Sequence, residues 1–232
     1  EALRNDGTSL QFQVQVHVPT GTLAGVEALV RWPHFQLGMV GPQEIAQLVT
    51  QGGLHEEFDT WVIRAASKQA AEWVREGVPL PLVSVNVWEQ TLRGPELLRV
   101  VEGTRLLELE LPRGAAADPA HVGMIGSLRT RGVRVAAEAL PEIGIDTLKL
   151  RPPLDAATVR AARARGIRVV AEGVETAQAQ AQALGAGCEI VQGFVFGPEV
   201  SAAEVSGLAG GRRGGGPPPK RGRRGGGGGP GR

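Results

Sequence analysis

Carboxylate and amide residues and one lysine close or directly follow the apolar runs of this chain: Glu27, Asn86, Glu110, Glu138, Lys149, Glu172 and Gln192. If the runs are strands of one parallel sheet, these side chains meet at its carboxyl edge. Carboxylate and amide oxygens without His or Cys suit Mg²⁺, Mn²⁺ or Ca²⁺ better than zinc. A lysine beside such a site favours chemistry on a phosphate group, where the metal polarises a phosphoryl oxygen and the lysine holds water or developing charge.

Short β-branched runs alternate with longer stretches of helical period along most of the chain. The runs predict eight strands, over residues 10–18, 24–31, 80–87, 105–111, 132–137, 145–150, 166–171 and 187–194. Apolar residues at three- and four-residue spacing predict helices over 43–51, 58–77, 95–102, 118–131, 155–165 and 176–185. Repeated βα units imply a mostly parallel sheet, so we expect an α/β fold of the (β/α)₈ barrel type with its site at the strand ends.

Two connections do not fit a regular barrel. Pro19 to Thr22 is a short turn that suits a hairpin, which predicts an antiparallel first strand. Only Glu138 to Gly144 separate the fifth and sixth strands, whereas a parallel crossover needs about a dozen residues or more. Either a helix is missing there or the barrel is locally irregular.

The composition of the chain divides it into two parts. Residues 210–232 hold 12 Gly, 4 Pro and 7 Lys or Arg, too little apolar surface to offset the entropy of ordering. We therefore expect residues 1–209 to form one domain with a net charge near −6, followed by a disordered basic tail. The tail has no aromatic residue, so we expect no specific binding of nucleic acid.

Several classes of protein are excluded by the same composition. A single cysteine, Cys188, rules out a disulfide framework, and we expect it to be a small buried side chain. No apolar run approaches the ~18 residues of a membrane span, and the amino end lacks a signal-peptide pattern. A cytoplasmic domain is the expectation that remains.

Six short motifs, in order, give this sequence a specific resemblance. Residues 27–32 read EALVRW, and the later motifs are Val85-Asn86, LELEL at 107–111, LKL at 148–150, VAEGVET at 170–176 and VQGF at 191–194. Together they resemble the EAL domain family of bacterial cyclic di-GMP phosphodiesterases and receptors, over roughly residues 9–200. The resemblance implies a modified (β/α)₈, TIM-like barrel with an antiparallel first strand, which agrees with the predicted hairpin.

The resemblance also implies roles for individual residues. Glu27, Asn86 and Glu110 would ligate the first of two Mg²⁺ or Mn²⁺ ions, with Lys149 orienting the attacking water and Glu172 handling protons or holding that water. Gln13, Leu29, Arg31, Glu175 and Gln192 would serve the ligand pocket, Arg31 by contacting a phosphate. Composition supports Lys149 independently, because the chain holds 3 lysines against 22 arginines and still places a compact ammonium there.

The sequence departs from the family pattern after the fifth strand. Active members carry two aspartates and a long loop, where this chain has Glu138-Ala139-Leu140-Pro141 and the short connection already noted. Glu138 could supply an oxygen to the second metal, but Ala139 supplies none, so we expect one metal site and a defective second one. Arg113 and Arg151 also replace family acids.

Two hypotheses about function follow from this pattern. The first is a receptor that binds cyclic di-GMP with phosphodiesterase activity impaired or lost, and signals to a protein partner or to an upstream sensory or cyclase-like domain. The alternative is an active metal-dependent phosphodiesterase that hydrolyses cyclic di-GMP to linear pGpG. A scaffold that binds neither ligand nor metal is disfavoured, because the motif residues persist together. Without the long loop, which helps form the family dimer, we expect a monomer.

Overall fold

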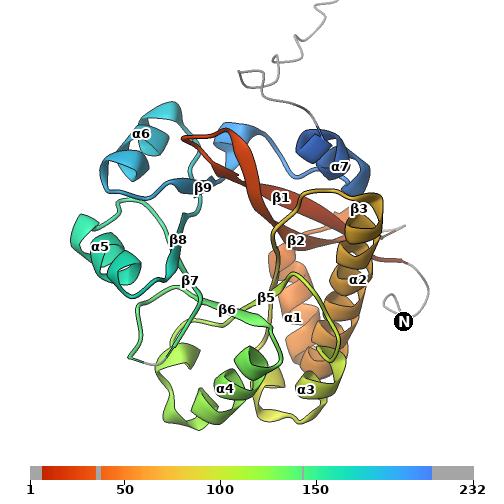
Figure 1. Ribbon diagram of the computed structural model, residues 1–232. Helices are drawn as coiled ribbons and strands as arrows, with labels where there is room; N and C mark the ends of the chain where they lie inside the picture. The colour runs from red at the N-terminus through yellow and green to blue at the C-terminus, as the bar shows by residue number, and fades with distance from the viewer. Residues whose placement is uncertain (1–6, 35–37, 143, 211–232) are drawn as a thin grey trace, which may run out of the picture.

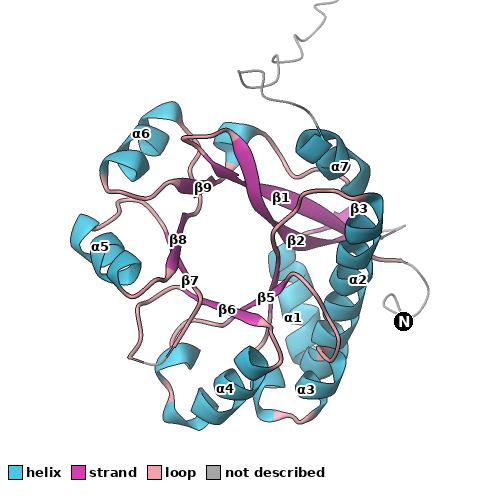
Figure 2. Ribbon diagram, viewed as in Figure 1, coloured by secondary structure: helices cyan, strands magenta, loops and turns pink. Residues whose placement is uncertain are grey.

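The computed structural model describes residues 7–34, 38–142 and 144–210 of the chain. Within them, nine strands form one sheet in the order β1-β9-β8-β7-β6-β5-β4-β2-β3, and a further pairing of β1 with β2 closes eight of these strands into a barrel. The helices surround the ring of strands (Figures 1 and 2). The predicted α/β barrel is therefore confirmed.

The first strand is antiparallel to both of its neighbours, as the hairpin predicts. β1 (Ser9–His17) turns through residues 18–21 into β2 (Thr22–His34) and pairs on its other side with β9 (Ile190–Gln192). All other pairings around the barrel are parallel. The register places Gln13 opposite Glu27, so two of the predicted site residues face each other across the first hairpin.

Helices connect most of the parallel strands. The remaining barrel strands are β4 (Val83–Asn86), β5 (Leu107–Glu110), β6 (Arg134–Ala137), β7 (Thr147–Leu150) and β8 (Arg168–Ala171). The connecting α-helices are α1 (Pro42–Gly52), α2 (His55–Glu76), α3 (Glu96–Val100), α4 (Val122–Thr130), α5 (Ala156–Ala164) and α6 (Ala177–Gly185). Short 3₁₀ turns lie at Thr91–Arg93, Ala115–Ala117, Pro119–His121 and Phe194–Phe196.

Local sequence explains where these helices begin and end. The side chains of Asp155 and Thr176 accept hydrogen bonds from main-chain N–H groups in the first turns of α5 and α6. Helix α2 ends at Gly77, whose φ of 71° is a left-handed conformation that favours glycine. Its buried face carries Val62, Ile63, Ala66, Ala70 and Trp73, which is the apolar spacing read from the sequence.

The connection between β6 and β7 contains no helix among its described residues. Residues 138–142 and 144–146 lie in no helix between the two strands, so the irregularity predicted from the short spacing is real. The turn is tied to its surroundings by Arg165, which donates to the main-chain oxygen of Pro141 at 2.7 Å.

Two elements escaped the sequence analysis. The short strand β3 (Gly38–Val40) pairs with the end of β2 outside the barrel, and helix α7 (Ala202–Gly210) packs near β1 and β2. Gly210 therefore ends a helix, although the expected tail began there. The rest of that tail, 211–232, lies outside the described residues.

The alternation of side chains in the strands separates a polar interior from an apolar shell. On β1 and β2, Phe12, Val14, Val26 and Ala28 belong to the buried core, and Phe12 makes an edge-on contact with Trp73 of α2 at 4.9 Å between ring centroids. The residues between them, such as Gln13, Gln15 and Glu27, point the other way. Polar side chains from opposite sides of the barrel can therefore meet inside it.

Candidate functional site

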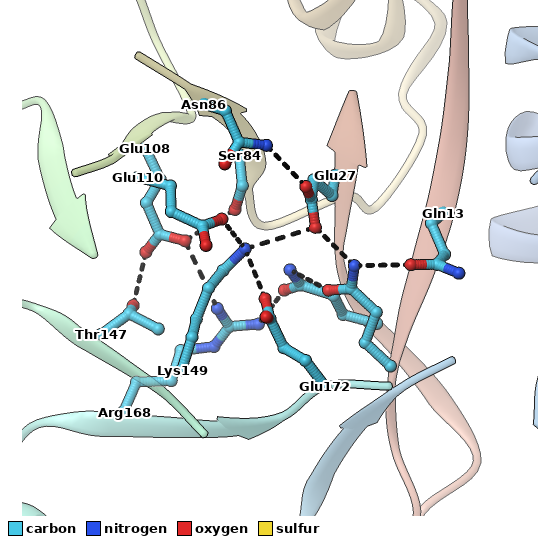
Figure 3. Close-up of polar contacts among 12 residues, drawn as sticks. Gln13, Glu27, Ser84, Asn86, Glu108, Glu110, Thr147, Lys149, Arg168 and Glu172 are labelled. Carbon is cyan, nitrogen blue, oxygen red and sulfur yellow. Dashed lines mark hydrogen bonds and ion pairs between the residues drawn. The ribbon is translucent and has the colours of Figure 1, made fainter. Parts of the chain in front are cut away.

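The ammonium of Lys149 lies at the centre of three carboxylates, which come from β2, from β5 and from the residue after β8 (Figure 3). Its Nζ is 2.9 Å from Glu172 Oε1 and 3.4 Å from Glu27 Oε2, and it also contacts Glu110 Oε2. Lys149 is 1% exposed and each glutamate is less than a tenth exposed. Three carboxyl groups therefore share one buried ammonium.

Amide side chains complete the surroundings of Glu27. Asn86 Nδ2 donates to Glu27 Oε1 at 2.7 Å, and Gln192 Nε2 donates to Glu27 Oε2 at 2.5 Å. Gln192 Nε2 also lies 2.8 Å from Gln13 Oε1, so the chain of contacts reaches the first strand (Figure 3). Six of the seven mouth residues read from the sequence thus form one connected network.

Burial and charge move the pKa values within this cluster in different directions. Burial raises the pKa of Glu110 to about 8. The positive charge of Lys149 lowers this pKa, while the carboxylates of Glu27 and Glu172 raise it further. Burial also raises the pKa of Glu172. Burial would raise the pKa of Glu27 too, but Lys149 and the hydrogen bonds from Gln192 and Asn86 bring it below its usual value.

For Lys149 the balance of burial and charge favours the ammonium. Burial alone would lower its pKa, but the negative charges of Glu27, Glu110 and Glu172 raise it well above the usual value. Lys149 therefore stays charged at any physiological pH. It can orient an oxygen or stabilise an anion, but it cannot serve as a base.

The donor set fits a divalent cation of the hard class. One carboxylate oxygen from each of Glu27, Glu110 and Glu172 lies within 4.8 Å of the other two, and these three residues are buried. The amide of Asn86 adjoins them, and neither His nor Cys belongs to this group. Carboxylate and amide oxygens are donors that suit Mg²⁺ or Mn²⁺.

Glu138 lies apart from this cluster. Its Oε2 accepts from Arg113 Nε at 2.9 Å, and its side chain is 29% exposed, well above the buried carboxylates. Arg113 is one of the basic residues that replace family acids, so one departure from the family pattern engages another. Ala139, next to it, is exposed and offers no ligand. The structure therefore gives no support to the assignment of Glu138 as a metal ligand.

The other residues assigned to the ligand pocket lie at the rim. Leu29 is half-buried on β2, and Glu175 is exposed in the loop between β8 and α6. Arg31, in the second half of β2, is paired with Glu199 at 2.8 Å, a partner that the sequence analysis did not identify. Arg31 thus already has an anionic partner within the chain.

A second polar layer lies beneath the site, and the sequence analysis missed it. Glu108, fully buried, accepts from Ser84 Oγ at 2.6 Å and from the hydroxyl of Thr147, while Arg168 Nη2 donates to Gln15 Oε1 at 2.7 Å (Figure 3). Gln15 Nε2 in turn donates to Gln192 at 2.9 Å. The layer therefore holds the strands in register directly below the Lys149 cluster.

This second layer had a signal in the sequence. Ser84 precedes Asn86 by two residues, as Glu108 precedes Glu110 and Thr147 precedes Lys149. Residues two apart in a strand share a face, so a strand-end polar residue predicts an inward position one step deeper.

The loops beside the mouth bring together another mixed group. Nε2 of the buried His121 is 3.5 Å from Glu89 Oε1 and 3.8 Å from Asp118 Oδ2. The same oxygen of Glu89 already pairs with Arg93 at 2.5 Å, so this group is an ion-pair network with its own cation.

Gly193 fixes how the last strand meets the loop after Glu172. Its φ is 150°, and a Cβ at this position would lie 2.2 Å from the main-chain oxygen of Val174. Val174 N also donates to Gln192 O at 3.1 Å. A side chain at residue 193 would therefore push apart the two segments that carry Gln192 and Glu172.

The fold and the site together define an α/β barrel with a lysine and oxygen ligands at its carboxyl end. The EAL domain family model matches residues 1–142, more than half of the chain, and the chain belongs to this family.

Named relatives and a solved structure agree with that membership. The chain is 42% identical over 82 residues to Cyclic di-GMP phosphodiesterase PA2567 of Pseudomonas aeruginosa, a match covering 35% of this chain and 14% of that protein. It is 27% identical over 239 residues to the bifunctional diguanylate cyclase/cyclic di-GMP phosphodiesterase MucR of the same organism, covering 88% of this chain and 35% of that protein. The chain thus spans about a third or less of these relatives.

The solved structure of the PaMucR phosphodiesterase in its c-di-GMP complex matches this fold with a TM-score of 0.79. The identity is 26%, over 88% of this chain and 96% of that one. In the described part of the chain, none of the helices has both the length and the apolar character needed to cross a membrane.

Proposed function

We propose that this domain binds cyclic di-GMP at the barrel mouth and that its phosphodiesterase activity is impaired or lost. The observation that carries the proposal is the contrast between two parts of the site. The Lys149 cluster with Asn86 and Gln192 is assembled, while Glu138 is engaged by Arg113 and Ala139 supplies no oxygen. A cytoplasmic domain that keeps the first part and lacks the second is suited to recognition of the dinucleotide.

The chain's own residues can perform several steps at a bound phosphodiester. Glu27, Asn86 and Glu110 would hold one Mg²⁺ or Mn²⁺ ion, which when bound polarises a phosphoryl oxygen and activates water. Lys149 stays protonated and can orient a water or stabilise charge that develops on oxygen. Glu172, whose pKa is raised by burial, can accept or release a proton at a bound water.

The rate of hydrolysis depends on the groups that stabilise the leaving oxygen. A two-metal site stabilises both the attacking and the leaving oxygens of the displacement. Glu138 stands where active family members have the first of two aspartates. Its side chain is partly exposed, and its charge is already neutralised by Arg113. A catalytic group that is misplaced by about 1 Å can lower the rate about a hundredfold. The short connection between β6 and β7 leaves little structure that could reposition Glu138.

The test combines turnover with binding. We expect calorimetry in EDTA to show that cyclic di-GMP binds, and turnover in Mn²⁺ at least about a hundredfold slower than that of the MucR domain assayed in parallel. Comparable turnover would instead support the alternative, an active phosphodiesterase that yields linear pGpG. Absence of binding with and without Mn²⁺ would refute both functions.

A further inference from the structure

The guanidinium of Arg31 is held by an anion that belongs to the chain itself. Arg31 Nη2 lies 2.8 Å from Glu199 Oε1, and the two side chains are only 17% and 21% exposed. Arg31 Nη1 donates to the main-chain oxygen of Val30 at 2.9 Å. Both terminal nitrogens of Arg31 are therefore engaged before any ligand arrives.

The backbone next to Glu199 is tied to the first strand. Phe12 of β1 and Val200 exchange two main-chain hydrogen bonds, of 2.8 and 2.9 Å, which bridge the segment after β9 to the first hairpin. Before it, Pro198 has a restricted φ and Gly197 has a φ of 105°. The carboxylate of Glu199 is thus presented to Arg31 from backbone that is hydrogen-bonded to β1 at the next residue and restricted by a proline at the preceding one.

A phosphate that approaches Arg31 must compete with this carboxylate. Arginine recognises phosphate best through two parallel N–H donors, and at least one of these comes from a terminal nitrogen. If Glu199 stays in place, the ligand brings a second negative charge to the same guanidinium. If Glu199 leaves, its ion pair is lost. Either course weakens binding of the ligand.

We infer that Glu199 is a built-in competitor for the phosphate contact of Arg31, and so a residue that sets the affinity of the domain for phosphodiester ligands. The inference rests on the proposed function, because it takes Arg31 to be a phosphate contact. Binding of a cyclic dinucleotide then exchanges one anion for another on Arg31. Glu199 raises the ligand concentration at which the domain becomes occupied.

The decisive variant is Glu199→Gln, which keeps the shape of the side chain and removes its charge. An amide oxygen can still accept from Arg31, so the guanidinium keeps its position. We expect calorimetry with cyclic di-GMP in EDTA to show binding about tenfold tighter, equivalent to about 1.4 kcal/mol. Glu189→Gln is the matched control, since Glu189 is partly exposed and pairs with Arg163 and His17, away from Arg31.

The outcomes separate this inference from the function it rests on. Tighter binding in Glu199→Gln, unchanged binding in Glu189→Gln, and loss of the gain when Arg31→Ala is added would support the inference. Equal or weaker binding in Glu199→Gln than in the parent would overturn it, because Glu199 would then merely position Arg31. No heat from either the parent or Glu199→Gln would instead remove the proposed binding function, and the inference with it.

Discussion

Replacing Lys149 by methionine should destabilise the domain in a way that a divalent cation reverses. The substitution leaves the contacting carboxylates of Glu27, Glu110 and Glu172 buried without their shared cation. Breaking a buried ion pair on one side costs roughly 3–5 kcal/mol. Because the pKa of Glu110 is about 8, this group is largely protonated at neutral pH and softens the loss. We therefore expect about 3 kcal/mol.

Thermal unfolding in EDTA at pH 7 measures this loss. For a domain of this size each kcal/mol shifts Tm by about 2–4 °C, so the variant should melt about 6–12 °C below the parent. Free Mn²⁺ at 100 times its Kd contributes about 2.7 kcal/mol, which would restore most of the difference. The gain in Tm from Mn²⁺ should be larger in the variant than in the parent, whose ammonium competes with the ion.

A matched control separates this effect from the loss of any lysine. Lys68→Met makes the same chemical change at an exposed position on α2 and should leave Tm within about 2 °C of the parent. If Lys149→Met has the same Tm as the parent in EDTA, then the three buried carboxylates do not need the ammonium to stabilise them. If it melts lower and Mn²⁺ restores nothing, then the cluster is a structural ion-pair network that binds no metal.

Three further predictions concern the rest of the chain. Restoring an aspartate pair with Glu138→Asp and Ala139→Asp should raise turnover of cyclic di-GMP in Mn²⁺ above the parent, and added Mn²⁺ affinity without turnover would move the defect to the short β6–β7 connection. Light scattering should give a monomer of 24.3 kDa, and twice that mass at low concentration would reveal another dimer surface. Burial raises the pKa of Asp59 from 3.8 to about 6, so its ionisation between pH 4 and 7 costs the parent up to about 3 kcal/mol of folding free energy. Asp59→Asn, which can still accept from Trp88 N, should gain urea stability relative to the parent as pH rises across that window, and a pH-independent difference would contradict this.

The strands were predictable because each apolar run is bounded by turn residues and closed by a polar one. All eight predicted runs are barrel strands, and the short spacing after Glu138 predicted the irregular connection, whose described residues form no helix. β3 was not predictable, since three residues carry no period and its pairing with β2 is tertiary. Helix α7 was missed because its alanine- and glycine-rich sequence has little amphipathic pattern, although Val205 is fully buried.

The site was predictable to the extent that one residue type at a strand end decides it. Parallel strands deliver their last inward side chain to the same edge, so Glu27, Glu110, Lys149 and Glu172 could be grouped without coordinates. Partners that come from loops distant in the sequence could not be predicted. Nothing near Arg31 in sequence indicates Glu199, which lies 168 residues further along the chain.

The charged groups of the mouth share a feature that links these experiments. Lys149 compensates the carboxylates that would hold a metal, Arg113 neutralises Glu138, and Glu199 engages Arg31. Each group that would face an ion or a phosphate therefore has an opposite charge from the chain itself, and the domain can fold with both ligands absent. Binding then becomes an exchange of ion pairs. Its free energy depends on the difference between the interaction free energies of the pair gained and the pair lost. Removing the competing anion in Glu199→Gln should strengthen phosphate binding, whereas removing the compensating cation in Lys149→Met should strengthen metal binding and weaken the fold.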